Sequence, residues 1–166
     1  MPELAPGSAF PDLDLPDHTE RPRLLSEVAG GDPVVLSFSR GWWCPKEQRY
    51  MGRLVELQAE LEVAYARLVV VSVDPPEVQA AFRAGLGARF LFLSDHERHW
   101  LDRLGLLEEA DTVHHPYLPV VFCLFPDLTI HSRYDGNWFL GRPTTSELVA
   151  DLRAISHGIR DDWAPA

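Results

Sequence analysis

Short apolar runs and helical repeats alternate along the first part of the chain. Continuous runs rich in β-branched and aromatic residues predict buried strands at 34–39, 68–73 and 90–93. Apolar side chains at spacings of three and four predict helices, with faces built from Tyr50 to Tyr65, from Val78 to Phe82 and from Trp100 to Leu104. Strands that are joined through helices are usually parallel, so this part of the chain predicts a parallel β-sheet.

The pattern changes in the last third of the chain. Two apolar strands, at 120–125 and 129–134, are separated by a short turn containing Pro126, and they predict an antiparallel hairpin. Thr144 and Glu147 then have the spacing of a capping box before a closing amphipathic helix. The expected fold class is α/β, with a central mixed β-sheet and helices on both faces.

Two local patterns add detail to this expectation. Phe10, Leu13 and Leu15, in a proline-rich N-terminal segment, predict a short edge strand. Ser94 and Glu97 repeat the capping-box spacing, which predicts that a helix begins directly after the third buried strand.

Length and charge narrow the functional classes. At 166 residues the chain is expected to form a single domain, residues 1–166, around one core. The formal net charge of −10 argues against nucleic acids and anionic membrane surfaces as partners, since both repel an acidic protein. The chain begins without a basic, apolar leader and has no apolar run of the roughly 18 residues that a membrane span needs. A cytoplasmic location is therefore expected.

The two cysteines, Cys44 and Cys123, have contrasting surroundings, and two are too few for a disulfide framework. Cys123 lies in the middle of an apolar run with no charge next to it in the sequence, and we interpret it as a core residue. Cys44 is followed by Pro45, and proline is favoured in the first position of a helix. Cys44 is therefore the expected N-cap residue, beside free backbone N–H groups and the positive end of the helix dipole.

The neighbours of this first cysteine favour a reactive thiol over an ordinary buried one. Cysteine reacts as the thiolate, which the flanking charges of Arg40 and Lys46 stabilise. Trp42 and Trp43 offer an apolar surface that could exclude water from the sulfur. Glu47 acts in the opposite direction, because its carboxylate lies on the same first helical turn.

Histidines supply the remaining candidates for chemistry. His96 and His99 lie three residues apart on an expected helix, and Asp111, His114 and His115 cluster in a loop. All are metal-ligand residue types, but neither group has a complete ligand set nearby in the sequence, so we expect no metal. No nucleotide-binding motif is present, and no cofactor is expected. Both groups are interpreted as solvent-facing, but the place of the 111–118 loop directly before Pro119 leaves open an approach of His114, His115 or Tyr117 to Cys44.

The segment Phe38-Ser39-Arg40-Gly41-Trp42-Trp43-Cys44-Pro45, directly after a buried strand, resembles the active-site segment of peroxiredoxin-like proteins. These proteins form the alkyl hydroperoxide reductase/thiol-specific antioxidant family and share the thioredoxin fold. The stretch from Phe10 to Leu15 is similar to the opening strand of the family, and the stretch from Tyr134 to Thr144 resembles the tail of one subgroup. The resemblance covers nearly the whole chain and implies a thioredoxin-like fold with an N-terminal β extension.

The resemblance also implies a chemistry and a set of site residues. Cys44 would be the peroxidatic cysteine, which attacks a hydroperoxide, becomes a sulfenic acid and is returned to the thiol by another thiol. Arg40 is its expected catalytic partner, with Arg142 as the alternative arginine, and Leu118-Pro119 resembles the cis-proline that lies against the active-site cysteine of thioredoxin folds. The residues expected to surround the site are Gly41, Trp42, Trp43, Pro45, Lys46, Glu47, Pro119 and Arg142.

The chain departs from the family pattern at three places. Ser37 and Gly41 stand where many peroxiredoxins carry proline and threonine, and many also carry an arginine near the position of Pro119. Glu47 stands where close relatives often have a second cysteine. We therefore expect a one-cysteine mechanism, in which a hydroperoxide is the substrate and the reductant is an external small thiol, a redox protein or the thiol of a second subunit.

Two alternatives stay open. A redox-sensing or binding module of the thioredoxin fold, with little or no peroxidase activity, is the alternative function, because the family's threonine, arginine and second cysteine are not matched. Trp138 and Phe139, next to a turn, leave open either a homodimer contact or internal packing.

Overall fold

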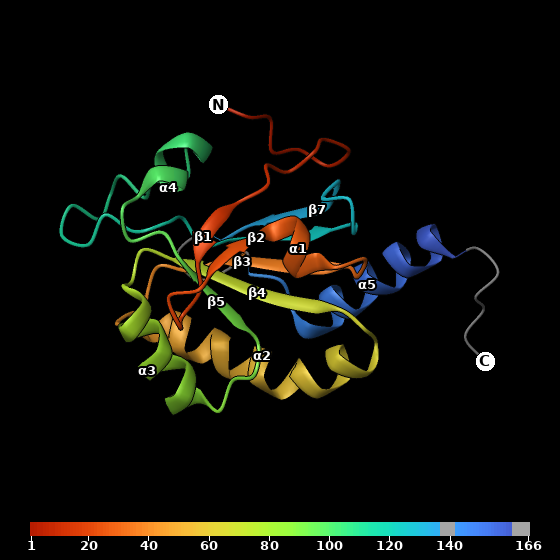
Figure 1. Cartoon of the computed structure of the whole chain (residues 1–166), viewed down its shortest axis with the longest axis horizontal. Coiled ribbons are helices and arrows are strands. Elements are labelled where there is room, and N and C mark those ends of the chain that lie inside the picture. The colour runs from red at the N-terminus through yellow and green to blue at the C-terminus, as the bar shows by residue number, and fades with distance from the viewer. Residues whose placement is uncertain (137–141, 161–166) are drawn as a thin grey trace.

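The computed structural model describes residues 1–136 and 142–160, and its elements are labelled in Figure 1. The strands are β1 (Asp14–Pro16), β2 (Pro22–Leu24), β3 (Val34–Phe38), β4 (Arg67–Ser72), β5 (Leu91–Ser94), β6 (Val120–Leu124) and β7 (Ile130–Asp135). The helices are α1 (Leu25–Ala29), α2 (Pro45–Val63), α3 (Pro76–Leu86), α4 (His99–Leu104) and α5 (Thr145–Ile159).

The central sheet consists of β5, β4, β3, β6 and β7, in that order. β3 pairs in parallel with β4, and β4 with β5, whereas β6 is antiparallel to both β3 and β7. The parallel strands are connected through helices, and the antiparallel pair β6–β7 through a tight turn. The predicted mixed sheet with a terminal hairpin is confirmed.

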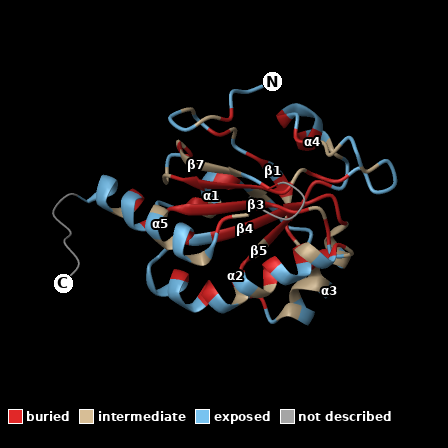
Figure 2. Ribbon diagram, turned by 180° about the vertical axis from the view of Figure 1, so that it is seen from behind, coloured by how far each residue is buried: buried red, intermediate tan, exposed pale blue. Residues whose placement is uncertain are grey.

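Side chains along β3 alternate between the two faces of this sheet. Val34, Leu36 and Phe38 pack into a cluster that includes residues of α1, α4 and the N-terminal segment. Val35 belongs to the cluster on the other face, with residues of α2 and α5. Buried residues concentrate along the strands, while the outer surfaces of the helices are exposed (Figure 2). Helices therefore cover both faces, as the hydrophobic pattern predicts.

Helix α2 carries most of the apolar face that its spacing predicts. The buried side chains at this spacing are Tyr50, Leu54, Leu57 and Leu61. Tyr65, the last residue of the predicted face, instead follows the helix with a φ of 53° and is exposed. Within residues 1–136 and 142–160, neither α2 nor any other helix has the length and apolar character needed to cross a lipid bilayer.

The N-terminal extension differs in detail from the predicted edge strand. β1 begins only at Asp14, and it pairs antiparallel with β2, a short strand that the hydrophobic pattern does not predict. Phe10 and Leu13 precede β1, and both side chains are buried. The Phe10 ring lies 4.9 Å from the ring of Phe122 on β6, so its apolar character reflects packing on the sheet.

One of the two predicted capping boxes forms. Thr144 and Glu147 make reciprocal side-chain to backbone hydrogen bonds at the start of α5. The expectation at Ser94 is wrong, because its hydroxyl donates to the Asp74 carbonyl in the loop after β4. The Asp95 carboxylate instead accepts from the backbone N–H groups of Trp100 and Leu101, and α4 begins later than predicted.

The bond between Leu118 and Pro119 is trans, as are all peptide bonds of the described residues. The expected cis-proline is therefore wrong. The Leu118 N–H donates to the Leu106 carbonyl at 2.7 Å, and the Leu118 carbonyl accepts from the Val120 N–H at 2.9 Å. These two bonds hold a tight three-residue turn around Pro119 at the start of β6, in which a trans proline is accommodated.

Asp17 stabilises the turn between β1 and β2. Its carboxylate accepts hydrogen bonds from the Thr19 backbone and hydroxyl, from the Arg21 N–H and from Arg23 Nε. Burial alone would raise the pKa of Asp17, but these bonds outweigh it and lower the pKa to about 2.

We expect Asp17→Asn to reduce the free energy of unfolding by about 2 kcal/mol at neutral pH. Because the folded pKa lies below the ordinary value of 3.8, this contribution is present above about pH 4 and is lost as the pH falls through 2. Urea denaturation at several pH values measures the difference. Asp14→Asn, at an exposed side chain of β1, is the control. A difference that does not shrink in acid would contradict the role of the charge.

Candidate active site

Cys44 lies at the N-cap of α2, as its sequence context predicts. The short loop after β3 ends at this residue, whose backbone is extended, and Pro45 is the first residue of the helix. The Cys44 N–H donates to the Gly41 carbonyl at 3.3 Å, and its carbonyl accepts from the Gln48 N–H at 3.0 Å. Cys44 is only 2% exposed and lies at the positive end of a 19-residue helix, although its sulfur makes no capping hydrogen bond.

The loop before Cys44 needs a glycine. Gly41 has a φ of +133°, a backbone conformation that residues other than glycine rarely adopt. A Cβ there would also lie 2.7 Å from Nε1 of Trp43. The threonine that many peroxiredoxins carry at this position therefore does not fit this loop, which gives a physical reason for the departure noted in the sequence.

Arg40 is the arginine that contacts the sulfur. One guanidinium nitrogen donates to Cys44 Sγ at 3.5 Å, Nε donates to Glu108 at 2.5 Å, and the third nitrogen donates to Asp111 at 3.0 Å. Burial lowers the pKa of Arg40, but Glu108 and then Cys44 outweigh it, and the pKa lies above its ordinary value. A fixed positive charge is thus held next to the thiol by two carboxylates.

Arg142 has a different role from the one that the sequence left open to it. It forms a salt bridge with Glu47, whose side chain is 1% exposed. The sequence analysis treats Glu47 as a charge that disfavours a thiolate at Cys44. The structure supplies a compensating cation for that carboxylate, and it comes from the segment just before α5.

His114 is a residue of this site that the sequence analysis does not rank. Its ring stacks on Trp43 with centroids 3.6 Å apart, and its Nδ1 lies 3.1 Å from the Asp111 carboxylate. The Arg40 guanidinium also lies 5.0 Å from the centroid of the Trp43 ring. In the sequence, the position of Asp111 and His114 in the loop directly before Pro119 is the feature that points to a place of His114 near the site.

Trp42 is half-exposed, and its backbone contributes a contact to the site loop. Its side chain is 48% exposed, and its backbone N–H donates to the Asp74 carboxylate at 3.1 Å. Burial raises the pKa of Asp74, against the hydrogen bonds from Trp42 and Ser72 that lower it. The Asp74 carboxylate thereby holds the backbone of the loop between β3 and α2 in place at Trp42.

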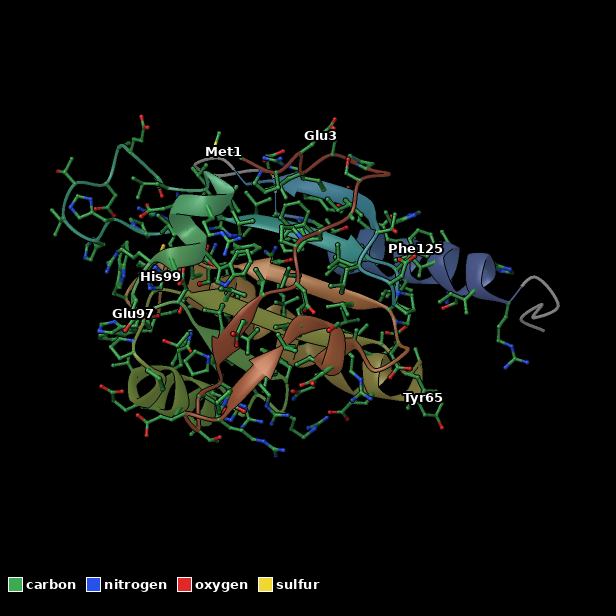
Figure 3. All side chains as sticks on the ribbon, turned by 45° about the horizontal axis from the view of Figure 1, so that its top comes forward. Met1, Glu3, Tyr65, Glu97, His99 and Phe125 are labelled. Atoms are coloured by element: carbon green, nitrogen blue, oxygen red, sulfur yellow. The ribbon has the colours of Figure 1, made fainter. Side chains whose placement is uncertain are left out.

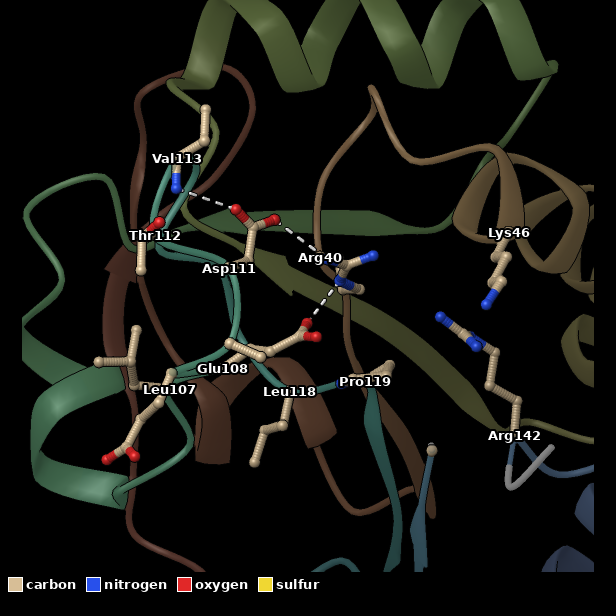
Figure 4. A pocket seen from close by; sticks show the side chains of 13 residues that line it. Arg40, Lys46, Leu107, Glu108, Asp111, Thr112, Val113, Leu118, Pro119 and Arg142 are labelled. Carbon is tan, nitrogen blue, oxygen red and sulfur yellow. Dashed lines mark hydrogen bonds and ion pairs between the residues drawn. The ribbon is translucent and has the colours of Figure 1, made fainter. Parts of the chain in front are cut away.

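Lys46, Pro119 and Arg142 line a cavity of about 650 Å³ together with Arg40 (Figure 4). Lys46 and Arg142 approach it from one side, and the loop that carries Glu108 approaches from the other. Four of the residues expected at the site therefore line one cavity, and Cys44 itself is not among its lining residues.

Cys123 is a core residue, as predicted. It lies in β6, has no exposed surface and is a free thiol, like Cys44. Burial raises the pKa of Cys123 to about 12, and the nearby Asp151 carboxylate acts in the same direction. No charged residue lies next to Cys123 in the sequence. The Asp151 carboxylate reaches it from α5, which is distant along the chain.

Among the described residues, no group of three or more His, Cys, Asp or Glu side chains is arranged to hold a metal ion. His99 lies at the surface, 3.1 Å from the Glu97 carboxylate (Figure 3). Trp138 and Phe139, which leave a homodimer contact open, lie outside the described residues.

We expect Arg40→Gln to slow the alkylation of Cys44 by iodoacetamide at neutral pH by about tenfold. The substitution removes the nearest positive charge and leaves the Glu108 and Asp111 carboxylates without it, and both changes disfavour the thiolate. Arg49→Gln, on the exposed side of α2, is the matched control. Equal alkylation rates in the two variants would contradict the electrostatic role of Arg40.

Solved structures share this fold. The peroxidoxin BcpB of Mycobacterium tuberculosis has a TM-score of 0.79 at 23% identity, covering 95% of this chain and 99% of that one. The AhpC of Enterococcus faecalis has a TM-score of 0.79 at 19% identity, covering 100% of both chains. A yeast mitochondrial 1-Cys peroxiredoxin, described with a resolving mechanism via glutathione/thioredoxin systems, has a TM-score of 0.76 at 17% identity over 99% of this chain and 84% of that one. The thioredoxin-like fold is therefore confirmed.

Sequence comparison identifies the family. A candidate peroxiredoxin of Mycobacterium tuberculosis strain H37Rv is 33% identical over 89 residues, which are 54% of this chain and 58% of that protein. The chain thus spans less than two thirds of the curated relative that it matches. The family model described as "AhpC/TSA family" matches residues 6–132, a stretch that holds Arg40, Cys44 and Pro119. The chain belongs to the AhpC/TSA family.

Proposed function

We propose that this protein is a thiol-dependent peroxidase that reduces hydroperoxides at Cys44. The observation that carries the proposal is the contact between the Arg40 guanidinium and Cys44 Sγ at the N-cap of α2. A charged arginine and a helix N-terminus both stabilise a thiolate, which is the nucleophilic form of cysteine. Membership of the AhpC/TSA family agrees with this chemistry.

In the first half-reaction, the Cys44 thiolate attacks the terminal oxygen of the hydroperoxide. The S–O bond forms as the O–O bond breaks, and the alkoxide that leaves takes up a proton to become the alcohol. Cys44 is then a sulfenic acid, and the peroxide has been reduced by two electrons. The Arg40 N–H groups are placed to stabilise the negative charge that moves from sulfur to oxygen.

The second half-reaction uses a reductant from outside the chain. Cys123, the other cysteine, is buried in β6 with a pKa of about 12, so it is a poor resolving thiol. Glu47 occupies the position of a second cysteine and forms a salt bridge with Arg142. An external thiol therefore condenses with the sulfenic acid. A reducing compartment such as the cytoplasm would supply that thiol.

The absence of a hydroxyl at Gly41 favours a second candidate function, a redox sensor that is oxidised by peroxide but turns over slowly. The two functions differ in the second half-reaction. A sensor forms the sulfenic acid at Cys44 without sustained consumption of peroxide.

We expect Cys44→Ser to lower peroxide consumption with dithiothreitol to the uncatalysed rate, because the nucleophile is lost. Cys123→Ala, a change in the core of β6, is the control and retains consumption. Equal rates for Cys44→Ser and the unmodified protein would refute the proposal. Labelling of Cys44 by dimedone with no turnover would favour the sensor.

One equivalent of peroxide is expected to add one oxygen atom to the intact protein, with the addition on Cys44. Addition of a small thiol should convert this species into a mixed disulfide at Cys44. Intact-mass spectrometry follows both steps. A product two hydrogens lighter than the reduced protein, with Cys44 linked to Cys123, would exclude the one-cysteine mechanism.

A further inference from the structure

The loop between α4 and β6 has a closed base and a turn at its tip. At the base, the Glu108 N–H donates to the Pro116 carbonyl at 2.9 Å. At the tip, the Asp111 carboxylate accepts from the backbone N–H groups of Val113 and His114 at 3.1 and 3.0 Å. This local turn places the side chains of Asp111 and His114 next to each other.

The His114 ring makes two side-chain contacts at this tip. Its Nδ1 lies 3.1 Å from Asp111 Oδ2, and because an ionised carboxylate can only accept, Nδ1 carries the proton of this hydrogen bond. Hydrogen bonds from the His114 backbone, from its ring and from Val113 outweigh burial and hold the pKa of Asp111 below its ordinary value. The ring also stacks on Trp43, with the two planes 12° apart. The hydrogen bond and the stack together restrict the ring to one orientation.

The Asp111 carboxylate connects this ring to Arg40. The oxygen that accepts from His114 Nδ1 also accepts from Arg40 Nη2, at 3.0 Å (Figure 4). Arg40 Nη1 in turn donates to Cys44 Sγ at 3.5 Å. The same guanidinium lies 5.0 Å from the centroid of the Trp43 ring on which His114 stacks. His114 therefore contacts two side chains that also contact Arg40.

We propose that His114 is a positioning residue, which through Asp111 fixes the Arg40 guanidinium at the reactive sulfur. Glu108 holds Nε of Arg40, and Asp111 holds Nη2, so the two carboxylates together prevent rotation of the guanidinium. A charge stabilises a thiolate more strongly when it stays at contact distance. The inference rests on the proposed function for the reaction that the Cys44 thiolate performs.

The test separates the hydrogen bond of His114 from its stack. His114→Phe keeps an aromatic ring for Trp43 and removes the donor to Asp111, whereas His114→Asn places an amide nitrogen at the position of Nδ1 and removes the ring. We expect His114→Phe to slow the alkylation of Cys44 by iodoacetamide at neutral pH by about threefold. His114→Asn should retain more than about half of the unmodified rate. The pH profile of alkylation should move to higher pH for His114→Phe.

The Arg40→Gln background shows whether His114 acts through the guanidinium. In that background His114→Phe should cause no further slowing, because two residues on one path are not additive. His115→Asn is the matched control in the same turn and should leave the rate unchanged, since asparagine tolerates the φ of 46° at this position. The His114 side chain is 41% exposed, and Arg98 donates to the His114 carbonyl at 3.1 Å, so we expect its variants to fold.

Equal slowing by His114→Phe with and without Arg40 would assign His114 to loop structure alone and overturn the inference. Slowing by His114→Asn as large as that by His114→Phe would overturn it too, because the stack would then matter more than the Asp111 contact. Unchanged alkylation in both variants would have the same consequence. Alkylation needs no peroxide, so these outcomes are separate from the proposed function, which fails if peroxide forms no sulfenic acid at Cys44 in the unmodified protein.

Discussion

The three contacts of Arg40 join the parts of this site. Its guanidinium touches Cys44 in the loop after β3, while Glu108 and Asp111, on a loop about seventy residues further along the chain, hold its other nitrogens. A single long side chain loses considerable rotamer freedom when it is fixed in this way. Two carboxylates offset that loss and also keep the guanidinium pointed at the sulfur. The electrostatic surroundings of Cys44 therefore depend on the folding of a loop that is distant in the sequence.

The central part of the sheet could be predicted from the sequence because β3, β4 and β6 are buried on both faces. A strand such as β4 is continuously apolar, and such runs are visible without knowledge of their neighbours. The features that were not predicted depend on contacts between segments. β2 exists through its pairing with β1. The start of α4 is set by Asp95, whose carboxylate also accepts from the buried Tyr117 hydroxyl at 2.5 Å, and no local spacing reveals that partner.

The candidate site likewise combines features that local sequence predicts with features that depend on contacts between distant segments. Cys44 could be placed at a helix start because the relevant signals, a strand, a glycine and Pro45, are local. The sequence favours Arg40 and leaves Arg142 open as the alternative. Only the folded structure shows that Arg40 contacts Cys44 Sγ, whereas Arg142 forms a salt bridge with Glu47. The sequence leaves an approach of His114 to the site open but does not show its contacts, for a related reason. Its stacking on Trp43 requires the loop before β6 to lie over the loop after β3.

Charge compensation around Cys44 has a consequence for the kind of molecule that can approach it. Arg40 and Arg142 each form salt bridges with carboxylates, so the site contains several cations without a large positive potential. Since the protein as a whole is acidic, a polyanion would be repelled before it reached the thiol. A neutral hydroperoxide meets no such barrier, and it encounters the guanidinium only at contact distance. In the proposed reaction, the charge that develops during O–O cleavage would therefore lie next to the Arg40 guanidinium, which contacts Cys44 Sγ.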